Sequence, residues 1–558
     1  MKHLLAAARP RRAILLVIAS LFAVGVPAAP ALAQTAAPAS AAAPSAAAPA
    51  SAISAATKGS SSLACNASAV RSALHIPNVT VASVTPQTSG SYPVPGTTTT
   101  LTGLPAFCEV ALTQADGHGN TINITVWLPS DWNGRFEGVG GGGYSCGVSY
   151  PALGTAIQAG YASASTDCGN HQPDGSFALT SSDQLNWPLI TDFASVGIHD
   201  MSVTGQAVTT AFYASKPRYS YFNGCSTGGR EGLMEAQRYP ADYNGIVSGA
   251  PAINWTRFIP AEIWPELVMK QSGDYLPTCK EDAFTAAVVK ACDPRDGVTD
   301  GIISDPADCH WNPATLVGTV TPCGTITATD AAVVARIWLG PVSTRGSKLW
   351  YGLEPGASFD GLAATTTVNG VTGPAPFSIS ATWLGTWLQQ NPSWNWQTLT
   401  YAQFDRLFQQ SVREFSGVIA TDDPNLSQFK RDGGKILIWH GLADQLIFPQ
   451  GTINYYQRVQ QAMGGAKQTG SFARLFLAPG AQHCASAAGP APANPLAAVA
   501  SWVEHGQAPT SILATVTDPT TGAVTLSRPL CAYPLTAHYT GHGNPSAASS
   551  FYCAPGQP

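Results

Sequence analysis

Charged side chains are scarce in this sequence of 558 residues, and no segment concentrates charge of one sign. Asp, Glu, Lys and Arg together make up 11% of the chain, with 28 basic against 33 acidic side chains. Without a basic block, the sequence gives no support for a nucleic acid partner. No two of the 12 cysteines have the C-x-x-C spacing that zinc and iron–sulfur sites commonly use. After the N-terminal segment no apolar run is long enough to span a bilayer, so we expect no membrane partner.

The N-terminal segment predicts export. Basic residues precede an apolar run from Ala13 to Val26, and Ala31 to Ala33 follows as a small-residue cleavage site. This is the layout of a cleavable signal peptide, and the run is shorter than the roughly 20 residues that a membrane anchor needs. We therefore predict a secreted or periplasmic protein, in which the even number of cysteines favours disulfides. The following Ala/Pro/Ser-rich stretch buries too little apolar surface to fold and is predicted to be a disordered linker.

Strand-like and helical patterns alternate in two separate parts of the chain. From Thr121 to Ser226 short β-type runs are separated by Gly-rich turns and by a helical stretch, which predicts a mainly parallel sheet covered on both faces. A long region rich in Trp and Pro interrupts this pattern, which resumes at Lys435 to Trp439. The predicted organisation is a signal peptide at 1–33, a linker at 34–62, a catalytic α/β domain at 63–251 and 433–558, and an inserted lid domain at 252–432.

A Gly-x-Ser-x-Gly motif at Gly224 to Gly228 predicts a nucleophilic serine. The motif follows the apolar run Tyr219 to Phe222 and precedes a segment of helical character, Gly229 to Gln237. Between a strand and a helix, small flanking residues permit a sharp turn that exposes the hydroxyl of Ser226 at the helix N-terminus. The motif alone is weak because Gly and Ser are common in this chain, and an ordinary loop is the alternative. Its setting favours the nucleophile.

The base and the acid that would activate Ser226 must follow it in the chain, because the order in this fold is Ser, acid, His. Asp444 and His483 each lie just after a strand-like run, where a loop can present a carboxylate to an imidazole. His440 is the competing histidine, and we interpret it as structural support for the Asp444 loop.

Two cysteines have matching positions beside these candidates. Cys225 precedes Ser226, and Cys484 follows His483. If the two loops meet, the cysteines must meet as well, so we predict a Cys225–Cys484 disulfide. Separate pairings elsewhere are the alternative, and they would make the two matching offsets a coincidence.

With these motifs in place, the sequence resembles the tannase and feruloyl esterase family, which also contains the hydrolase of mono(2-hydroxyethyl) terephthalate. The resemblance covers most of the chain after the linker and is specific in combination. The matching stretches are Trp132 to Phe136, Gly140 to Gly143, Gly160 to Asp167, Cys225 to Glu231, Tyr239 to Gly245, Gly249 to Pro251, Cys292 to Asp305, His440 to Asp444 and Gln482 to Cys484.

The resemblance implies an α/β-hydrolase fold with a large lid and a Ser226–Asp444–His483 triad. It also implies an oxyanion hole formed by the backbone N–H of Thr227 and of a glycine in Gly140 to Gly143, with Gly141 and Gly142 as the favoured candidates, where glycine lets the backbone approach the substrate closely. Pairings of Cys65 with Cys108 and of Cys531 with Cys553 follow from the same resemblance. The resemblance does not assign the other four cysteines outside the catalytic and acidic loops, and of their three possible combinations we put forward Cys146 with Cys168 and Cys279 with Cys323.

An acidic loop in the predicted lid is a candidate calcium site. Asp293, Asp296 and Asp300 are crowded together, and such carboxylates repel one another unless a hard cation lies among them. The resemblance implies structural Ca²⁺ held by these side chains and by the carbonyls of Val298 and Ile302; a solvated acidic turn is the alternative. Cys292 and Cys309 flank the loop, and a bridge between them would contribute about 3 kcal/mol through loop entropy.

The expected function is that of a serine ester hydrolase that cleaves esters of hydroxycinnamic acids through an acyl-enzyme. Its expected partner is a small aromatic ester, with plant polysaccharides and polyphenols as candidate carriers of that ester. A tannase that cleaves gallate esters and a terephthalate monoester hydrolase are the alternatives within the enzyme class. A secreted binding protein that keeps the fold without the chemistry is the alternative outside it, and the complete triad argues against it.

Overall fold

The computed structural model describes residues 62–556. The predicted signal peptide and all but the last residue of the predicted linker lie outside these described residues. Within them, no helix combines the length and the apolar composition that crossing a bilayer would require.

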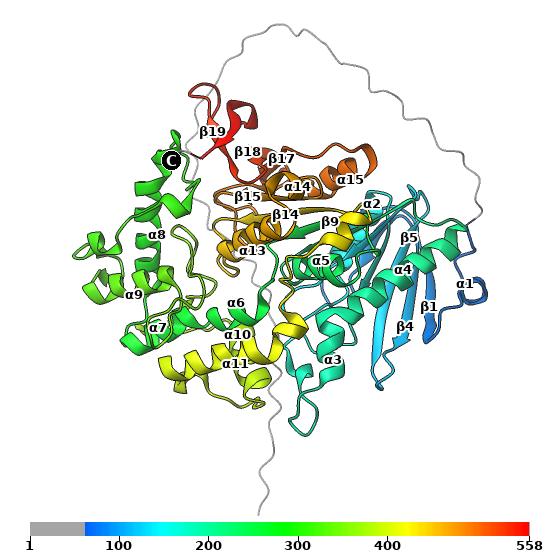
Figure 1. Cartoon of the computed structure of the whole chain (residues 1–558), viewed down its shortest axis with the longest axis horizontal. Helices are drawn as coiled ribbons and strands as arrows, with labels where there is room; N and C mark the ends of the chain where they lie inside the picture. The colour runs from blue at the N-terminus through cyan, green and yellow to red at the C-terminus, as the bar shows by residue number, and fades with distance from the viewer. Residues whose placement is uncertain (1–61, 557–558) are drawn as a thin grey trace, which may run out of the picture. The chain divides into compact units, whose positions relative to one another are not determined.

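A nine-stranded sheet forms the centre of the structure (Figure 1), and its strands are ordered β1-β4-β5-β7-β6-β8-β9-β14-β15. The six strands from β7 to β15 in this order pair in parallel, as predicted, while β1, β4 and β5 form an antiparallel edge. The strands are β1 Val79–Gln87, β4 Phe107–Ala115, β5 Thr121–Pro129, β6 Arg135–Val139, β7 Ala162–Thr166, β8 Tyr219–Cys225, β9 Gly245–Gly249, β14 Lys435–Gly441 and β15 Ala473–Ala478.

Helices cover both faces of the sheet because alternate strand residues point to opposite faces. On β14, Ile436 and Ile438 belong to the core that includes helices α4 and α5, while Leu437 and Trp439 belong to the core that includes α2 and α15. Both faces are therefore apolar and buried, as a parallel sheet requires. The helices of this part are α1 Ala67–Ala73, α2 Tyr150–Gln158, α3 Trp187–Thr191, α4 Gly197–Tyr213, α5 Thr227–Arg238, α12 Ser427–Arg431, α13 Pro449–Ala462, α14 Ala466–Thr469 and α15 Pro495–His505.

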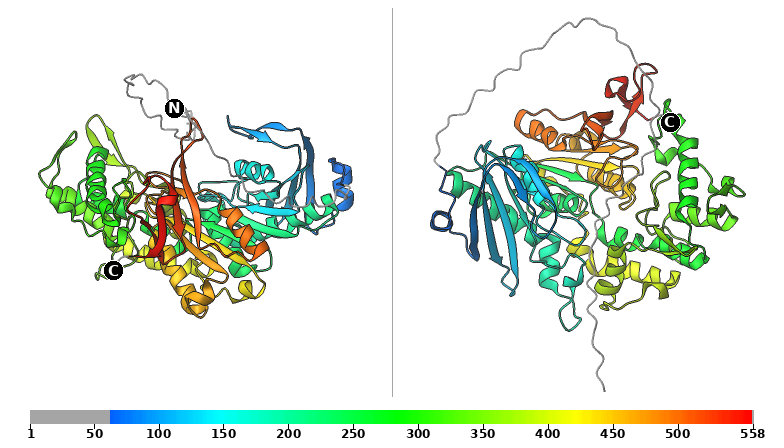
Figure 2. Two further views of the ribbon diagram at one scale, coloured as in Figure 1. Left: turned by 90° about the horizontal axis from the view of Figure 1, so that it is seen from above. Right: turned by 180° about the vertical axis from the view of Figure 1, so that it is seen from behind.

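A helical segment leaves the sheet after β9 and returns at β14, and these two strands are hydrogen-bonded neighbours. Both views of Figure 2 place the green helices of this lid and the blue N-terminal strands on opposite sides of the central strands. The lid contains α6 Trp255–Ala261, α7 Trp264–Ser272, α8 Thr278–Cys292, α9 Ala328–Leu339, α10 Ser378–Thr382 and α11 Tyr401–Ile419, with the short strands β10 Val320–Thr321, β11 Gly324–Thr325, β12 Thr365–Val368 and β13 Val371–Pro374.

Tryptophans of the lid pack into its core. Trp255, Trp264, Trp383 and Trp387 are each at most 2% exposed. Trp255, Trp383 and Trp387 cluster with Tyr144 from the sheet domain, at ring-centroid distances of 4.8–6.2 Å. These aromatic side chains join the lid to the sheet domain instead of standing free in a pocket.

Small antiparallel strands and six disulfides complete the structure. The remaining strands are β2 Gly90–Pro93, β3 Thr100–Leu104, β16 Ala491–Pro492, β17 Ser511–Thr517, β18 Val524–Cys531, β19 Leu535–Tyr539 and β20 Phe551–Pro555. The disulfides are Cys65–Cys108, Cys146–Cys168, Cys225–Cys484, Cys279–Cys323, Cys292–Cys309 and Cys531–Cys553. All 12 cysteines are therefore paired, in the combination that the sequence analysis put forward.

Candidate active site

Ser226 lies at the joint between β8, which ends at Cys225, and α5, which begins at Thr227. Its backbone has φ 64° and ψ −126°, a conformation that costs free energy for any residue with a Cβ. Two glycines make the turn possible. A Cβ on Gly224 would lie 2.5 Å from the carbonyl carbon of Gly228, and one on Gly228 would lie 3.1 Å from the Cα of Gly140. This is the strained strand-to-helix turn that the motif predicts.

The predicted base and acid are hydrogen-bonded to each other. Nδ1 of His483 lies 2.8 Å from Oδ2 of Asp444, whose side chain is fully buried. The other carboxylate oxygen, Oδ1, accepts the N–H groups of Leu446 at 2.8 Å and Ile447 at 2.9 Å. Gln445 adds a tie, because its Oε1 accepts the N–H of His483 at 3.0 Å. The carboxylate is therefore fixed from both sides, and it orients the imidazole.

His440 supports this carboxylate and does not replace His483. Its Nε2 lies 3.1 Å from Oδ2 of Asp444, and its Nδ1 lies 2.8 Å from the hydroxyl of Thr452. Burial favours the neutral form of Asp444, but electrostatic attraction and hydrogen bonds from His483 and His440 outweigh it and hold the pKa of Asp444 well below its usual range. The site thus keeps a carboxylate beside His483.

The disulfide between Cys225 and Cys484 brings the serine turn and the histidine loop together. The Cα atoms of the two cysteines are 6.0 Å apart, although 259 positions separate them in the sequence. Ser226 follows one of these cysteines and His483 precedes the other. The bridge therefore brings the two loops that carry Ser226 and His483 together beyond the carboxyl ends of β8 and β15.

The glycine loop after β6 lies against the serine turn, but two of its amides are already engaged. The N–H of Gly141 donates to Oε2 of Glu231 at 3.0 Å, and the N–H of Gly142 donates to the carbonyl of Ser145 at 2.8 Å. The two favoured glycines, Gly141 and Gly142, therefore both have acceptors within the protein, and in this structure neither amide is free to bind an oxyanion. Thr227 remains suitable, because the first N–H of a helix has no acceptor within the helix.

Glu231 is a residue of this site that the sequence analysis quoted only as part of a motif. Its side chain is fully buried on α5, and burial raises its pKa to about 7, against the opposing effect of Arg230 and of the Gly141 amide. Arg230 is itself buried and donates to the carbonyls of Phe193 and Ala194. An acidic residue shortly after the serine, on the same helix, was the signal that the sequence offered for Glu231. Its role as an acceptor could not be predicted, because it depends on a contact with Gly141, 90 positions away.

The acidic loop of the lid gathers oxygen donors that suit Ca²⁺ in kind. Asp293 accepts the N–H groups of Asp300 at 3.1 Å and Gly301 at 3.0 Å, and Asp296 accepts that of Val298 at 3.0 Å. Asp300 pairs with Arg528 from β18. Among residues 62–556, Asp293 and Asp296 form no ion pair with a basic side chain, whereas Asp300 would have to exchange Arg528 for the ion.

Comparisons with known proteins agree on one family. The sequence model described as "Tannase and feruloyl esterase" matches residues 108–554. A probable feruloyl esterase of Arthroderma benhamiae is 43% identical over 459 residues, which cover 80% of this chain and 85% of that protein. The structure of tannin acyl hydrolase from Aspergillus niger aligns with a TM-score of 0.80 at 26% identity, covering 89% of this chain and 97% of the other. Feruloyl esterase B from Aspergillus oryzae aligns with a TM-score of 0.77 at 27% identity, covering 87% and 98%.

Proposed function

The chain belongs to the tannase and feruloyl esterase family and is a carboxylic ester hydrolase, and on this premise we propose that Ser226 is its nucleophile and hydroxycinnamate esters are its substrates. One observation carries the assignment of the nucleophile. A hydrogen-bonded Asp444–His483 pair stands beside the only strained serine turn of this kind, joined to it by the Cys225–Cys484 bridge, within the described residues.

The proposed reaction uses His483 as general base and general acid. Its Nδ1 is held by Asp444, which leaves Nε2 to take the proton from the hydroxyl of Ser226 as the oxygen attacks the ester carbonyl. The new C–O bond forms a tetrahedral oxyanion. His483 then protonates the departing alcohol, and water activated in the same way hydrolyses the acyl-enzyme. Asp444 stays ionised throughout and stabilises the imidazolium.

The oxyanion requires backbone donors at the start of α5 and on the glycine loop. Thr227 supplies the first N–H. We assign the second donor to Gly143, because Gly141 and Gly142 already have acceptors and the N–H of Gly143 has none among residues 62–556. The hydroxyl of Thr227 donates to the carbonyl of Gly143 at 2.7 Å, which fixes the loop against the helix.

The relative that is 43% identical is named a probable feruloyl esterase, and this favours ferulate-type acids over gallate. A tannase remains the second candidate, because the tannin acyl hydrolase of Aspergillus niger shares the fold over nearly its full length. Attachment of the substrate to plant polysaccharide or polyphenol, export of the protein, and Ca²⁺ bound by Asp293, Asp296, Asp300 and the carbonyls of Val298 and Ile302 are further parts of the proposal. The calcium would stiffen the lid and take no part in the chemistry.

Two measurements test the nucleophile. Ser226→Ala should lower kcat by at least about 1,000-fold with an unchanged melting curve, since the triad acts as a unit. A fluorophosphonate probe should label the wild-type protein at Ser226 and leave the variant unlabelled. Substantial turnover by a folded Ser226→Ala protein would refute the assignment.

A substrate panel tests the acid. Methyl ferulate, methyl gallate and a terephthalate monoester are compared by kcat/KM with the same enzyme preparation. The proposal expects methyl ferulate to be turned over best. A preference for methyl gallate would overturn the substrate while leaving the nucleophile in place.

A further inference from the structure

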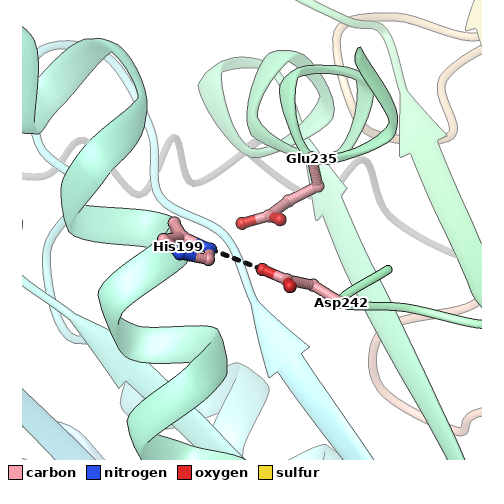
Figure 3. A group of neighbouring side chains, drawn as sticks. All are labelled: His199, Glu235 and Asp242. Atoms are coloured by element: carbon pink, nitrogen blue, oxygen red, sulfur yellow. Dashed lines mark hydrogen bonds and ion pairs between the residues drawn. The ribbon is translucent and has the colours of Figure 1, made fainter. Parts of the chain in front are cut away.

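Three side chains that could bind a metal ion meet on the α4–α5 face of the sheet, away from the serine. His199 comes from α4, Glu235 from the last turns of α5, and Asp242 from the loop that leads to β9 (Figure 3). One ligand atom from each lies within 4.8 Å of the other two. Among residues 62–556 no other three His, Cys, Asp or Glu side chains bring their ligand atoms this close together, and this includes the carboxylates of the acidic loop of the lid.

Glu235 brings an unsatisfied oxygen to this cluster. The residue is 1% exposed, and Figure 3 shows its carboxylate directed toward Asp242 and His199. Its Oε1 accepts the hydroxyl of Ser202 at 3.3 Å, while its Oε2 has no hydrogen-bond donor among the described residues. One carboxylate oxygen of Glu235 lies within 4.8 Å of one of Asp242, and a proton or a metal ion at this place would relieve the repulsion between the two groups.

His199 pairs with Asp242 at 2.7 Å, and no other basic side chain among residues 62–556 forms an ion pair with Glu235 or Asp242. Arg238, at the end of α5, donates instead to the hydroxyl of Ser195 at 3.0 Å and to the carbonyls of Gly417 at 3.2 Å and Val418 at 2.7 Å. The C-terminal end of α5 adds partial negative charge at the same place, because the last carbonyls of a helix have no partner within it. The electrostatic environment therefore favours a cation.

The donors are already held in position. Nδ1 of His199 lies 2.7 Å from Oδ2 of Asp242, and its ring stacks on Tyr239 at 3.8 Å with an interplanar angle of 8°. The amide of Gln206 donates to the carbonyl of Asp242 at 3.1 Å. Ligands about 2.1 Å from a tetrahedral ion stand about 3.4 Å apart, so His199 and Asp242 need to separate by less than about 1 Å to admit one.

We propose that His199, Glu235 and Asp242 form a binding site for one divalent transition-metal ion, such as Zn²⁺ or Mn²⁺. One imidazole nitrogen with two carboxylates suits these ions better than Ca²⁺, which prefers oxygen ligands alone. Side-chain exposures of 31% for His199 and 13% for Asp242 give the ion access and leave room for water ligands.

The ion would be structural. Glu235 follows Ser226 by nine positions on α5, which places the ion about 13 Å along the helix from the serine. It would join α4, the end of α5 and the approach to β9, so its removal should lower the melting temperature and leave turnover at 25 °C nearly unchanged.

Metal content after equilibrium dialysis tests the proposal. The full-length chain, freed of metal and of any affinity tag, is dialysed against Zn²⁺ or Mn²⁺ alone, and bound metal is counted by mass spectrometry. His199→Gln and Glu235→Gln should each hold one ion fewer than wild type, or bind it at least tenfold more weakly. Glu235→Gln mimics a protonated carboxyl group, so this variant should fold even if His199→Gln does not.

Two matched controls separate this site from other cation sites. His171→Gln removes a histidine that pairs with a single carboxylate, Asp167, at 2.9 Å. Asp296→Asn disables the acidic loop of the lid. Both controls should keep the ion that the test variants lose. If wild type binds no more Zn²⁺ or Mn²⁺ than Glu235→Gln, a shared proton occupies the cluster and the metal site is refuted.

Discussion

Removing the Cys225–Cys484 bridge should damage catalysis more than stability alone explains. The perturbation is the double variant Cys225→Ser with Cys484→Ser. In the chain-entropy model the loop of 259 positions gives this bridge about 5.6 kcal/mol of stabilisation, slightly above the usual range for disulfides. The Cys279–Cys323 bridge lies inside the loop and shortens it too little to change that figure by more than about 0.2 kcal/mol. The same change also frees the serine turn from the histidine loop, and displacement of catalytic groups by about 1 Å can cost about 100-fold in rate.

The matched control is Cys531→Ser with Cys553→Ser, which opens a loop of 22 positions near the C-terminus and should cost about 3 kcal/mol. Both proteins are compared with wild type by urea unfolding, and kcat is measured at a temperature where each is folded. We expect a kcat lowered about 10- to 100-fold in the first variant and nearly unchanged in the control. A wild-type kcat in the folded Cys225/Cys484 variant would refute the idea that the bridge aligns the site.

Three further predictions concern the acid of the triad, the calcium loop and a buried lid acid. Asp444→Asn should lower kcat/KM about 1,000- to 10,000-fold by holding His483 in the wrong tautomer, and steady-state kinetics would show it; a loss below tenfold would contradict the triad. In protein freed of all metal ions, added Ca²⁺ should raise the melting temperature of wild type but not of Asp296→Asn, and an equal shift in both would argue against calcium in the loop. Burial raises the pKa of Glu266 to about 7, although the N–H of Ala375 opposes this shift. The protonated side chain of Glu266 therefore makes its full contribution to stability below about pH 4.5, and this contribution is lost as the pH rises through 7. Glu266→Gln should therefore gain about 1–3 kcal/mol on wild type at pH 8 but not at pH 4.5 in urea titrations, whereas exposed Glu414→Gln should change neither; an equal effect at both pH values would contradict the assigned burial.

The parts of the site that could be predicted from the sequence are those that a few neighbouring residues determine. The serine turn depends on Gly224 and Gly228, which lie within two positions of Ser226, so a five-residue motif contains its steric requirement. The parallel strands could likewise be predicted, because strand-like and helical patterns alternate along the chain. The antiparallel edge of β1, β4 and β5 was not predicted, although β4 and β5 form a hairpin across the short turn Asp116 to Asn120, whose Asp-Gly step is a local signal for such a turn.

The oxyanion donor of the glycine loop could not be identified from the sequence for a related reason. A run of glycines shows that the backbone can approach the substrate, but it does not show which amide stays free. Glu231, 90 positions later, takes the amide of Gly141, and this depends on how the loop after β6 lies on α5. The pairing of Asp300 with Arg528, 228 positions away, escaped the calcium prediction in the same way. Contacts of one side chain with a remote backbone amide or charge have no local signature.

The contact between the serine turn and the histidine loop is more distant than any of these, yet the sequence indicated it. The reason is that each cysteine is adjacent to its catalytic residue, one before Ser226 and one after His483. A covalent bond demands a short and definite separation, so two local offsets together specify one non-local distance. His199, Glu235 and Asp242 have no such pair of markers, and only the folded positions of α4 and α5 bring their side chains to one place. A site made of distant residues can be predicted from the sequence when each of them is next to a residue whose bond fixes a distance, as a cysteine does. Without such markers, the site can be identified only from the folded structure.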